Sequence, residues 1–203
     1  MRYSLKHTVA QLISYVLHPG ILPTLGAIYV LHVLPNSYDQ ASTLRLVGTV
    51  FVGTYVAPLL GTLLLTWTGI ISSIHLVNRK ERIYPYIIGA ACMIATSNYL
   101  SRGSAPIEII LCVLSASVVL LVSTILIPYF KSSAHMAGIS GFLALYMGMH
   151  LRYQSGELHI LLLLIAIMSA VAWARLSLKR HTLKEVLSGT ILGFGVLFIL
   201  LSK

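Results

Sequence analysis

Charged side chains are scarce in this sequence, and carboxylates are the scarcest of them. Asp and Glu together number 5 against 14 Lys and Arg, so charged residues make up 9% of 203 residues and the formal net charge is +9. A soluble domain carries about 25% charged residues. Because 57% of this chain is hydrophobic, so few charges exclude a water-soluble enzyme and a disordered chain. The apolar excess is expected to face lipid.

The same shortage argues against a metal site. A Mg²⁺ or Ca²⁺ cage built from protein needs several oxygen ligands, and the acids are dispersed as Asp39, Glu81, Glu108, Glu157 and Glu185. No metal and no cofactor are therefore expected. The two cysteines, Cys92 and Cys112, lie inside apolar stretches and are interpreted as packing residues, which excludes a disulfide scaffold.

Seven long apolar runs are present instead. At a rise of about 1.5 Å per residue, a helix of about 20 residues crosses a bilayer core that is ~30 Å thick. We therefore expect an all-α, polytopic transmembrane bundle of six to seven helices, forming a single integral membrane domain over residues 1–203 in the cell or inner membrane. Pro58 predicts a bend in the second run, and the third run is the weakest because it is short. The runs are 12–34, 46–74, 86–100, 107–129, 134–151, 158–174 and 183–201.

Cations and histidines gather in three connectors, at residues 75–85, 130–135 and 175–185. Because they stand at the ends of apolar segments, a nucleic-acid partner is not expected. Two predicted crossings separate each connector from the next, so all three emerge on one membrane face. Their basic and imidazole side chains are His75, Arg79, Lys80, Arg82, Lys131, His135, Arg175, Lys179, Arg180, His181 and Lys184.

The third connector holds the sharpest pattern, R-x5-H-x3-E, formed by Arg175, His181 and Glu185. His181 and Glu185 are four residues apart, so they share a face of the helix that starts near Thr182. A carboxylate on one ring nitrogen sets the imidazole tautomer and leaves the other nitrogen free as a nucleophile or base. A turn before His181 is needed to aim Arg175 at an anion held there.

The other two connectors supply an anion site and further charge. Ser133 and His135 stand where a helix begins, and backbone N–H groups at such an end attract anions. His135 is placed to give a proton to a leaving oxygen. Arg79, Lys80 and Arg82 add fixed positive charge, so that together the connectors hold what phosphoryl transfer requires.

These residues resemble the membrane-bound type 2 phosphatidic acid phosphatases, relatives of the vanadium haloperoxidases. Their third motif, S-R-x5-H-x3-D, is matched at 174–185 with Ala for serine and Glu for aspartate. Their second, P-S-G-H, is matched by Ser133 and His135, with Ser132 for proline and Ala134 for glycine. In their first motif, K-x6-R-P, only Pro85 is kept, since Val77 and Tyr84 replace its lysine and arginine. The resemblance covers about residues 75–195.

The resemblance implies metal-independent hydrolysis of a lipid phosphomonoester or pyrophosphate through a phosphohistidine intermediate. His181 would be the nucleophile, Glu185 its orienting partner and His135 the general acid. Phosphate ligands would be Arg175 and Ser133, with Lys80, Arg82 and Arg79 substituting for the first motif. The partners expected are the lipid substrate and the bilayer.

Two further matters stay open at this point. Because Tyr84, Ala134 and Glu185 differ from the family's motifs, a second function is the alternative. In it, the chain is a catalytically weak or inactive membrane protein that binds anionic lipid or a partner through the same pocket. The side of the membrane is also open, because the positive-inside rule favours a cytoplasmic site only slightly, whereas characterised relatives commonly work on the outer face.

Small residues four apart predict close helix packing. Gly189 and Gly193 form G-x3-G, a spacing that lets two membrane helices approach with their backbones in contact. We interpret it as the place where the fifth apolar segment packs against the seventh. The alternative is that it mediates self-association of the protein.

Overall fold

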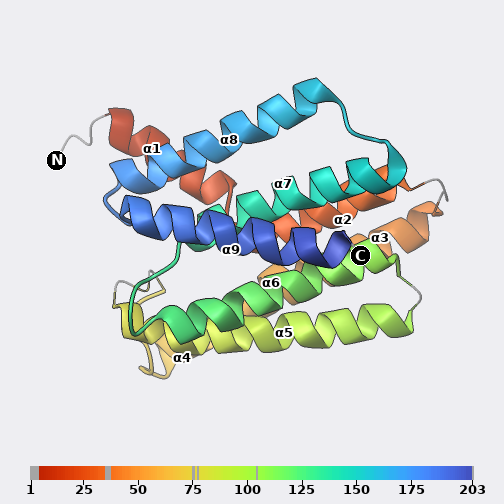
Figure 1. The fold of residues 1–203 in the computed structure, drawn as a ribbon. Coiled ribbons are helices and arrows are strands. Elements are labelled where there is room, and N and C mark those ends of the chain that lie inside the picture. Colours follow the sequence, from red (N-terminus) through yellow and green to blue (C-terminus); the bar gives the residue numbers. More distant parts are fainter. Residues whose placement is uncertain (1–4, 35–37, 75, 77, 104, 203) are drawn as a thin grey trace. The chain divides into compact units, whose positions relative to one another are not determined.

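The computed structural model describes residues 5–34, 38–74, 76, 78–103 and 105–202, and within these ranges it is helical, with no strand. Each of the seven apolar runs is helical over most of its length (Figure 1), which confirms the all-α helical bundle. Five helical stretches in the described residues are long and apolar enough to cross a membrane, and they indicate a membrane protein. These stretches are Leu5–Val33, Gln40–Trp67, Ile107–Leu126, Leu158–Ser177 and Leu183–Leu201.

Two predicted spans are absent from that set, although both form helices of 20 residues. These are α5 (Ile83–Arg102) and α7 (Ala134–Tyr153). In α7 half of the residues are buried, and small or polar ones such as Ser140 lower its hydropathy, since a helix packed against protein has no need of the apolar surface that lipid demands. α5 buries no more residues than α6, and its lower hydropathy comes from polar residues such as Ser97 and Asn98.

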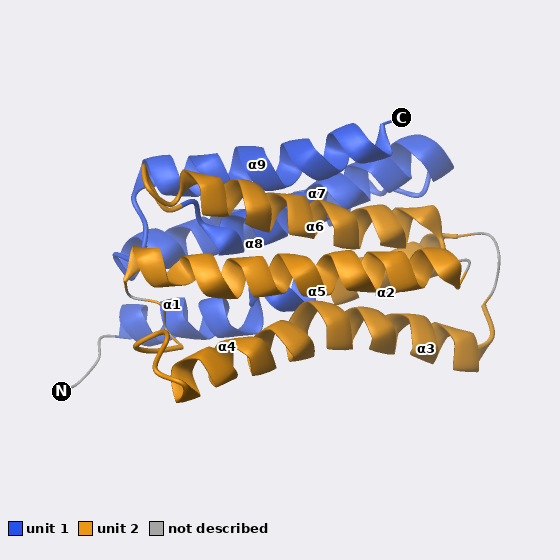
Figure 2. Ribbon diagram, turned by 90° about the horizontal axis from the view of Figure 1, so that it is seen from below, with its two compact units in different colours: residues 1–22, 132–203 blue, residues 23–131 orange. Residues whose placement is uncertain are grey.

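The chain divides into two compact units, coloured separately in Figure 2. The first comprises residues 1–22 and 132–203, and the second comprises residues 23–131. The histidines of the predicted site, with Arg175, Ser133 and Glu185, fall in the first unit. Arg79, Lys80 and Arg82 fall in the second.

In the first unit, α7 lies along the final helix, while α8 packs against α1 and α7. A short 3₁₀ turn, η1, follows α1 and packs on α7. This turn begins with Pro19, which has no N–H to give to a continuing helix. The elements are α1 (Leu5–Val16), η1 (Pro19–Ile21), α7, α8 (Leu158–Ser177) and α9 (Leu183–Leu201).

Glycines in α9 make its contact with α7 unusually close. A Cβ at Gly189 would overlap the carbonyl oxygen of Ser133, and one at Gly193 would overlap the backbone of Ala137. Only glycine lets the two backbones meet in this way. The prediction that G-x3-G seats the fifth apolar segment on the seventh is therefore confirmed.

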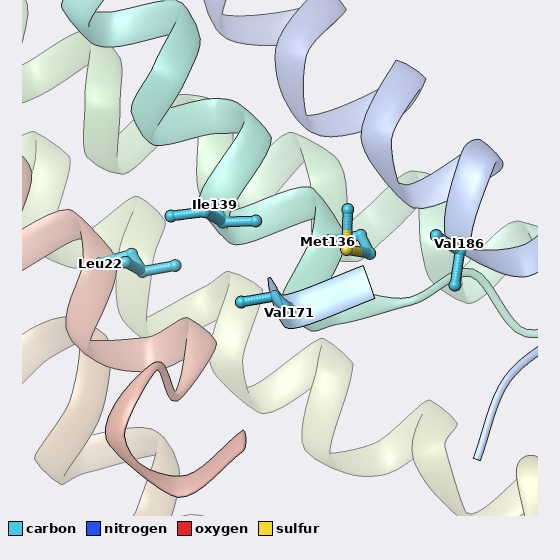
Figure 3. Close-up of a cluster of buried hydrophobic side chains, with 5 residues drawn as sticks. All are labelled: Leu22, Met136, Ile139, Val171 and Val186. Atoms are coloured by element: carbon cyan, nitrogen blue, oxygen red, sulfur yellow. The ribbon is translucent and has the colours of Figure 1, made fainter. Parts of the chain in front are cut away.

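A buried apolar cluster holds the same unit together next to this contact (Figure 3). It joins Leu22, the first residue of α2 (Leu22–Val33), to residues of α7, α8 and α9. Each member is less than 5% exposed, so the cluster anchors the elements that carry the predicted histidines. The members are Leu22, Met136, Ile139, Val171 and Val186.

In the second unit, the predicted bend near Pro58 takes the form of a π-helical turn, η2 (Val52–Val56). Ala57 donates its N–H to Val52, and this wider turn accommodates Pro58, which lacks an N–H and would crowd a tighter helix. The remaining elements, with α5 packed on α4 and α6, are α2 (Leu22–Val33), α3 (Gln40–Phe51), α4 (Ala57–Trp67), η3 (Arg79–Arg82) and α6 (Ile107–Leu126).

Candidate functional site

The chain reverses direction between Arg175 and His181, as the R-x5-H spacing required. Arg180 donates its N–H to the carbonyl of Arg175 at 3.2 Å, and Lys179 donates to Leu176 at 3.0 Å. This pair of bonds is a Schellman motif, which ends a helix with one residue in the left-handed conformation. Lys179 is that residue, with φ of 52°. Arg175 thus stays in the last turn of α8, while His181 stands at the entrance to α9.

His181 is buried and bonded to Glu185. Nδ1 of His181 lies 3.1 Å from Oε2 of Glu185, and the two side chains are only 2% and 13% exposed. A carboxylate accepts hydrogen bonds, so Nδ1 carries the hydrogen of this bond and a neutral ring leaves a lone pair on Nε2. The expected pairing is therefore present, and a ring held in this way can act as a nucleophile.

Besides His181, the Glu185 side chain bonds a second partner, the backbone of Thr182. Its Oε2 also accepts the backbone N–H of Thr182 at 3.0 Å, and the Thr182 hydroxyl accepts the N–H of Glu185. This is a capping box, which satisfies the free N–H groups at the start of α9. One carboxylate therefore begins the helix and orients the histidine.

The start of α7 meets the start of α9. Ser133 is the N-cap residue of α7, and its N–H donates to the carbonyl of Glu185 at 3.0 Å. The Ser133 residue is fully buried, and its Oγ has no hydrogen-bond partner. A buried hydroxyl that lacks a partner is costly, and an anion bound beside it would supply one. The second and third connectors thus come together, as predicted.

His135 is held by α1, a helix that the motifs do not include. Its Nε2 lies 3.0 Å from the backbone oxygen of Ser14. Since a carbonyl oxygen only accepts, Nε2 carries the hydrogen, and a proton for a leaving oxygen would have to sit on Nδ1. The ring of His18 lies edge-on to that of His135, with centroids 5.9 Å apart.

Arg175 reaches the same helix. Its NH1 donates to the Ser14 hydroxyl at 3.2 Å. The charges of Arg175 and His181 are also near enough to interact with the His135 ring. The first unit therefore brings His181, Glu185, Ser133, His135 and Arg175 into one connected cluster.

The three cations of the first connector are placed separately, in the second unit. Arg79 donates to the carbonyl of Tyr129 at 3.4 Å, and Arg82 donates to that of Leu76 at 3.2 Å. Lys80 is exposed. Their approach to a phosphate at His181 stays a prediction. His75 and Val77, which belong to the same connector, lie outside the described residues.

Sequence reasoning missed Ser14 altogether and did not include His18 in the site. The signal for His18 was its place at the break His18-Pro19-Gly20, where a polar ring interrupts an apolar run. No pattern marks Ser14.

Comparisons of the chain with family models, with curated proteins and with solved structures find no match.

Proposed function

We propose that this chain is a membrane lipid phosphatase that hydrolyses a phosphomonoester or pyrophosphate of a lipid through a phosphohistidine on His181, without a metal ion. The observation that carries the proposal is the buried His181–Glu185 pair, at 3.1 Å. The backbone N–H of Ser133, a residue whose hydroxyl has no hydrogen-bond partner, is bonded to the carbonyl of Glu185. The resemblance of the second and third connectors to the type 2 phosphatidic acid phosphatases supports the same chemistry.

In the first step, Nε2 of His181 attacks phosphorus and the bond from phosphorus to the lipid oxygen breaks. That oxygen leaves with the bonding electron pair and takes a proton from His135. Arg175 and the N-terminus of α7 stabilise the charge on the phosphoryl oxygens. Glu185 keeps the His181 ring in the reactive tautomer and stabilises its positive charge as the bond to phosphorus forms.

In the second step, water attacks the phosphohistidine and gives a proton back to His135. The bond between phosphorus and Nε2 breaks, and its electron pair returns to the ring. The products are the lipid alcohol and inorganic phosphate, or a lipid phosphate and inorganic phosphate when the substrate is a pyrophosphate. His181 and His135 end in their starting protonation states.

The test is phosphate release from phosphatidate, phosphatidylglycerophosphate or a polyprenyl pyrophosphate by purified protein in detergent. His181→Ala is expected to abolish release, whereas EDTA leaves it intact. His159→Ala is a matched control, because His159 and Glu157 form a pair with the same Nδ1–Oε2 distance of 3.1 Å but with side chains 72% and 67% exposed. Full activity in folded His181→Ala would refute the mechanism.

A second candidate function is anion binding without turnover, and Ala134 favours it because its methyl group stands where the resembled family has glycine beside phosphate. Orthovanadate, which mimics a phosphoryl group in transfer, separates the two. It is expected to raise the melting temperature of either an enzyme or a binding protein. Only the enzyme releases phosphate.

A further inference from the structure

We infer that Ser14 of α1 is a positioning residue of this site, which holds the Arg175 guanidinium in place for the phosphoryl group. This inference rests on the proposed function, since it assigns Ser14 a part in the handling of the same phosphate. Ser14 lies outside all three motifs. Its contacts join α1 to both the predicted phosphate ligand and the predicted general acid.

The hydroxyl of Ser14 is itself oriented. Its Oγ donates to the carbonyl of Ala10 at 3.0 Å, and this uses its only hydrogen. The lone pairs of the oxygen are thereby directed away from the helix axis, and one of them accepts NH1 of Arg175 at 3.2 Å. Ser14 is only 8% exposed, so water is a poor substitute for this acceptor.

The backbone of Ser14 holds the second group. Its carbonyl lies in the last turn of α1, where helix carbonyls need partners from outside the helix. His135 supplies that partner through Nε2 at 3.0 Å.

α1 is attached to the rest of the unit through η1, which packs on α7. The side chain of His18 accepts the N–H of Gly20 and begins η1. A Cβ on Gly138 of α7 would meet Leu22 and Pro19, so η1 is in close contact with the first turns of α7. Ser14 is therefore a fixed acceptor for the Arg175 guanidinium.

The hydrogen bond from Arg175 to Ser14 is charge-assisted, because a neutral hydroxyl accepts it from a guanidinium, and it orients the guanidinium without opposing its positive charge. If Ser14 is replaced by alanine, the guanidinium loses this acceptor and occupies other positions. Misplacement of a binding group by about 1 Å can cost on the order of 100-fold in rate.

The experiment compares Ser14→Ala and Ser14→Thr with wild type, in detergent. Ser14→Ala is expected to lower kcat/KM for lipid phosphate by about 10- to 100-fold, and to weaken orthovanadate binding, read as the melting-temperature shift, by about tenfold. Ser14→Thr keeps the hydroxyl and restores both. Ser115→Ala is the matched control, because Ser115 is also a buried helical serine bonded to a carbonyl, that of Cys112, in the second unit.

A double-substitution cycle separates positioning from a merely structural role. If Ser14 acts through Arg175, Ser14→Ala causes little further loss in the Arg175→Ala background, whereas a structural defect adds its full effect. Additive losses, or a Ser14→Ala protein that behaves as Ser115→Ala does, would overturn the inference. Melting temperatures of all variants are recorded, so that loss of folded protein is not taken for loss of positioning.

The orthovanadate measurement also separates failure of this inference from failure of the proposed function. If wild type releases no phosphate but binds orthovanadate more tightly than Ser14→Ala, the enzyme is refuted and the role of Ser14 stands. If wild type hydrolyses lipid phosphate and Ser14→Ala does so equally well, the reverse holds. If wild type neither turns over lipid phosphate nor binds orthovanadate, both are overturned.

Discussion

Substitution of Gly193 by alanine tests whether the contact between α7 and α9 supports the site. A Cβ at this position would lie 2.6 Å from the carbonyl carbon and Cα of Ala137, and would overlap its carbonyl oxygen. Carbon atoms in contact are normally about 3.5–4.0 Å apart. The obstacle is backbone, so no side-chain rotation relieves it and the two helices have to separate by about 1 Å.

The magnitude follows from two opposing effects. Overpacking of this kind costs about 1–3 kcal/mol and occasionally more, while replacing a helical glycine by alanine returns up to about 1 kcal/mol. Because the overlap involves three backbone atoms, we take the overpacking cost at the upper end. The net loss is about 2 kcal/mol of unfolding free energy, or about 30-fold in the unfolding equilibrium.

Gly195 is the matched control in the same helix, two residues further on. Nothing lies within 4 Å of a Cβ built there, so Gly195→Ala is expected to be neutral or stabilising by up to about 1 kcal/mol. Both variants are unfolded in mixed micelles by increasing fractions of SDS, with circular dichroism as the signal. The reasoning fails if Gly193→Ala is as stable as wild type, or if both variants lose stability equally.

The substitution also has a consequence for activity. Gly189 and Gly193 face the segment of α7 that starts at Ser133, whose N–H is bonded to Glu185. Separation of the helices lengthens that bond and moves Ser133 away from Glu185. Phosphate release per folded molecule is therefore expected to fall in Gly193→Ala and to be unchanged in Gly195→Ala.

Three further predictions concern the turn that carries His181. Lys179→Gly relieves a left-handed non-glycine residue with φ of 52° and is expected to raise the unfolding free energy, measured by the same SDS titration, by about 1 kcal/mol. Thr182→Ala removes one half of the capping box and is expected to lower it by about 1 kcal/mol. Glu185→Gln retains an acceptor for the cap but loses the charge beside His181. Phosphate release is therefore expected to fall at least about tenfold, with little change in the unfolding free energy. Comparable losses of activity and of stability would contradict this expectation.

Much of the fold follows from local sequence signals. Apolar runs near 20 residues long become helices because backbone groups in lipid can bond only within their own segment, and the bends at Pro19 and Pro58 follow from a missing N–H. The apolar runs do not tell which helices pack against protein, as α7 does with half of its residues buried. Ser140 of α7 is fully buried, and its residue type alone does not indicate that.

The site divides in the same way between local and distant contacts. The pairing of His181 with Glu185 was predictable because one helical turn brings residues four apart together. The contacts of Ser14 join residues 121 and 161 positions apart, and a serine in an amphipathic helix carries no mark of such a role. The second of these contacts starts in the last turn of α8, whose position against α1 depends on the packing of the whole unit.

One departure from the resembled motif, the glutamate at position 185, has a physical reason in the structure. The family pattern has aspartate here, and a glutamate carries its carboxylate one methylene farther from the backbone. In α9 that carboxylate reaches back to the N–H of Thr182 and still lies 3.1 Å from Nδ1 of His181. Glu is the residue that a capping box prefers at this position, so the longer side chain combines helix initiation with orientation of the ring. An aspartate would be drawn closer to its own backbone and could not serve both partners with this geometry, so glutamate suits a histidine that is oriented at the start of a helix.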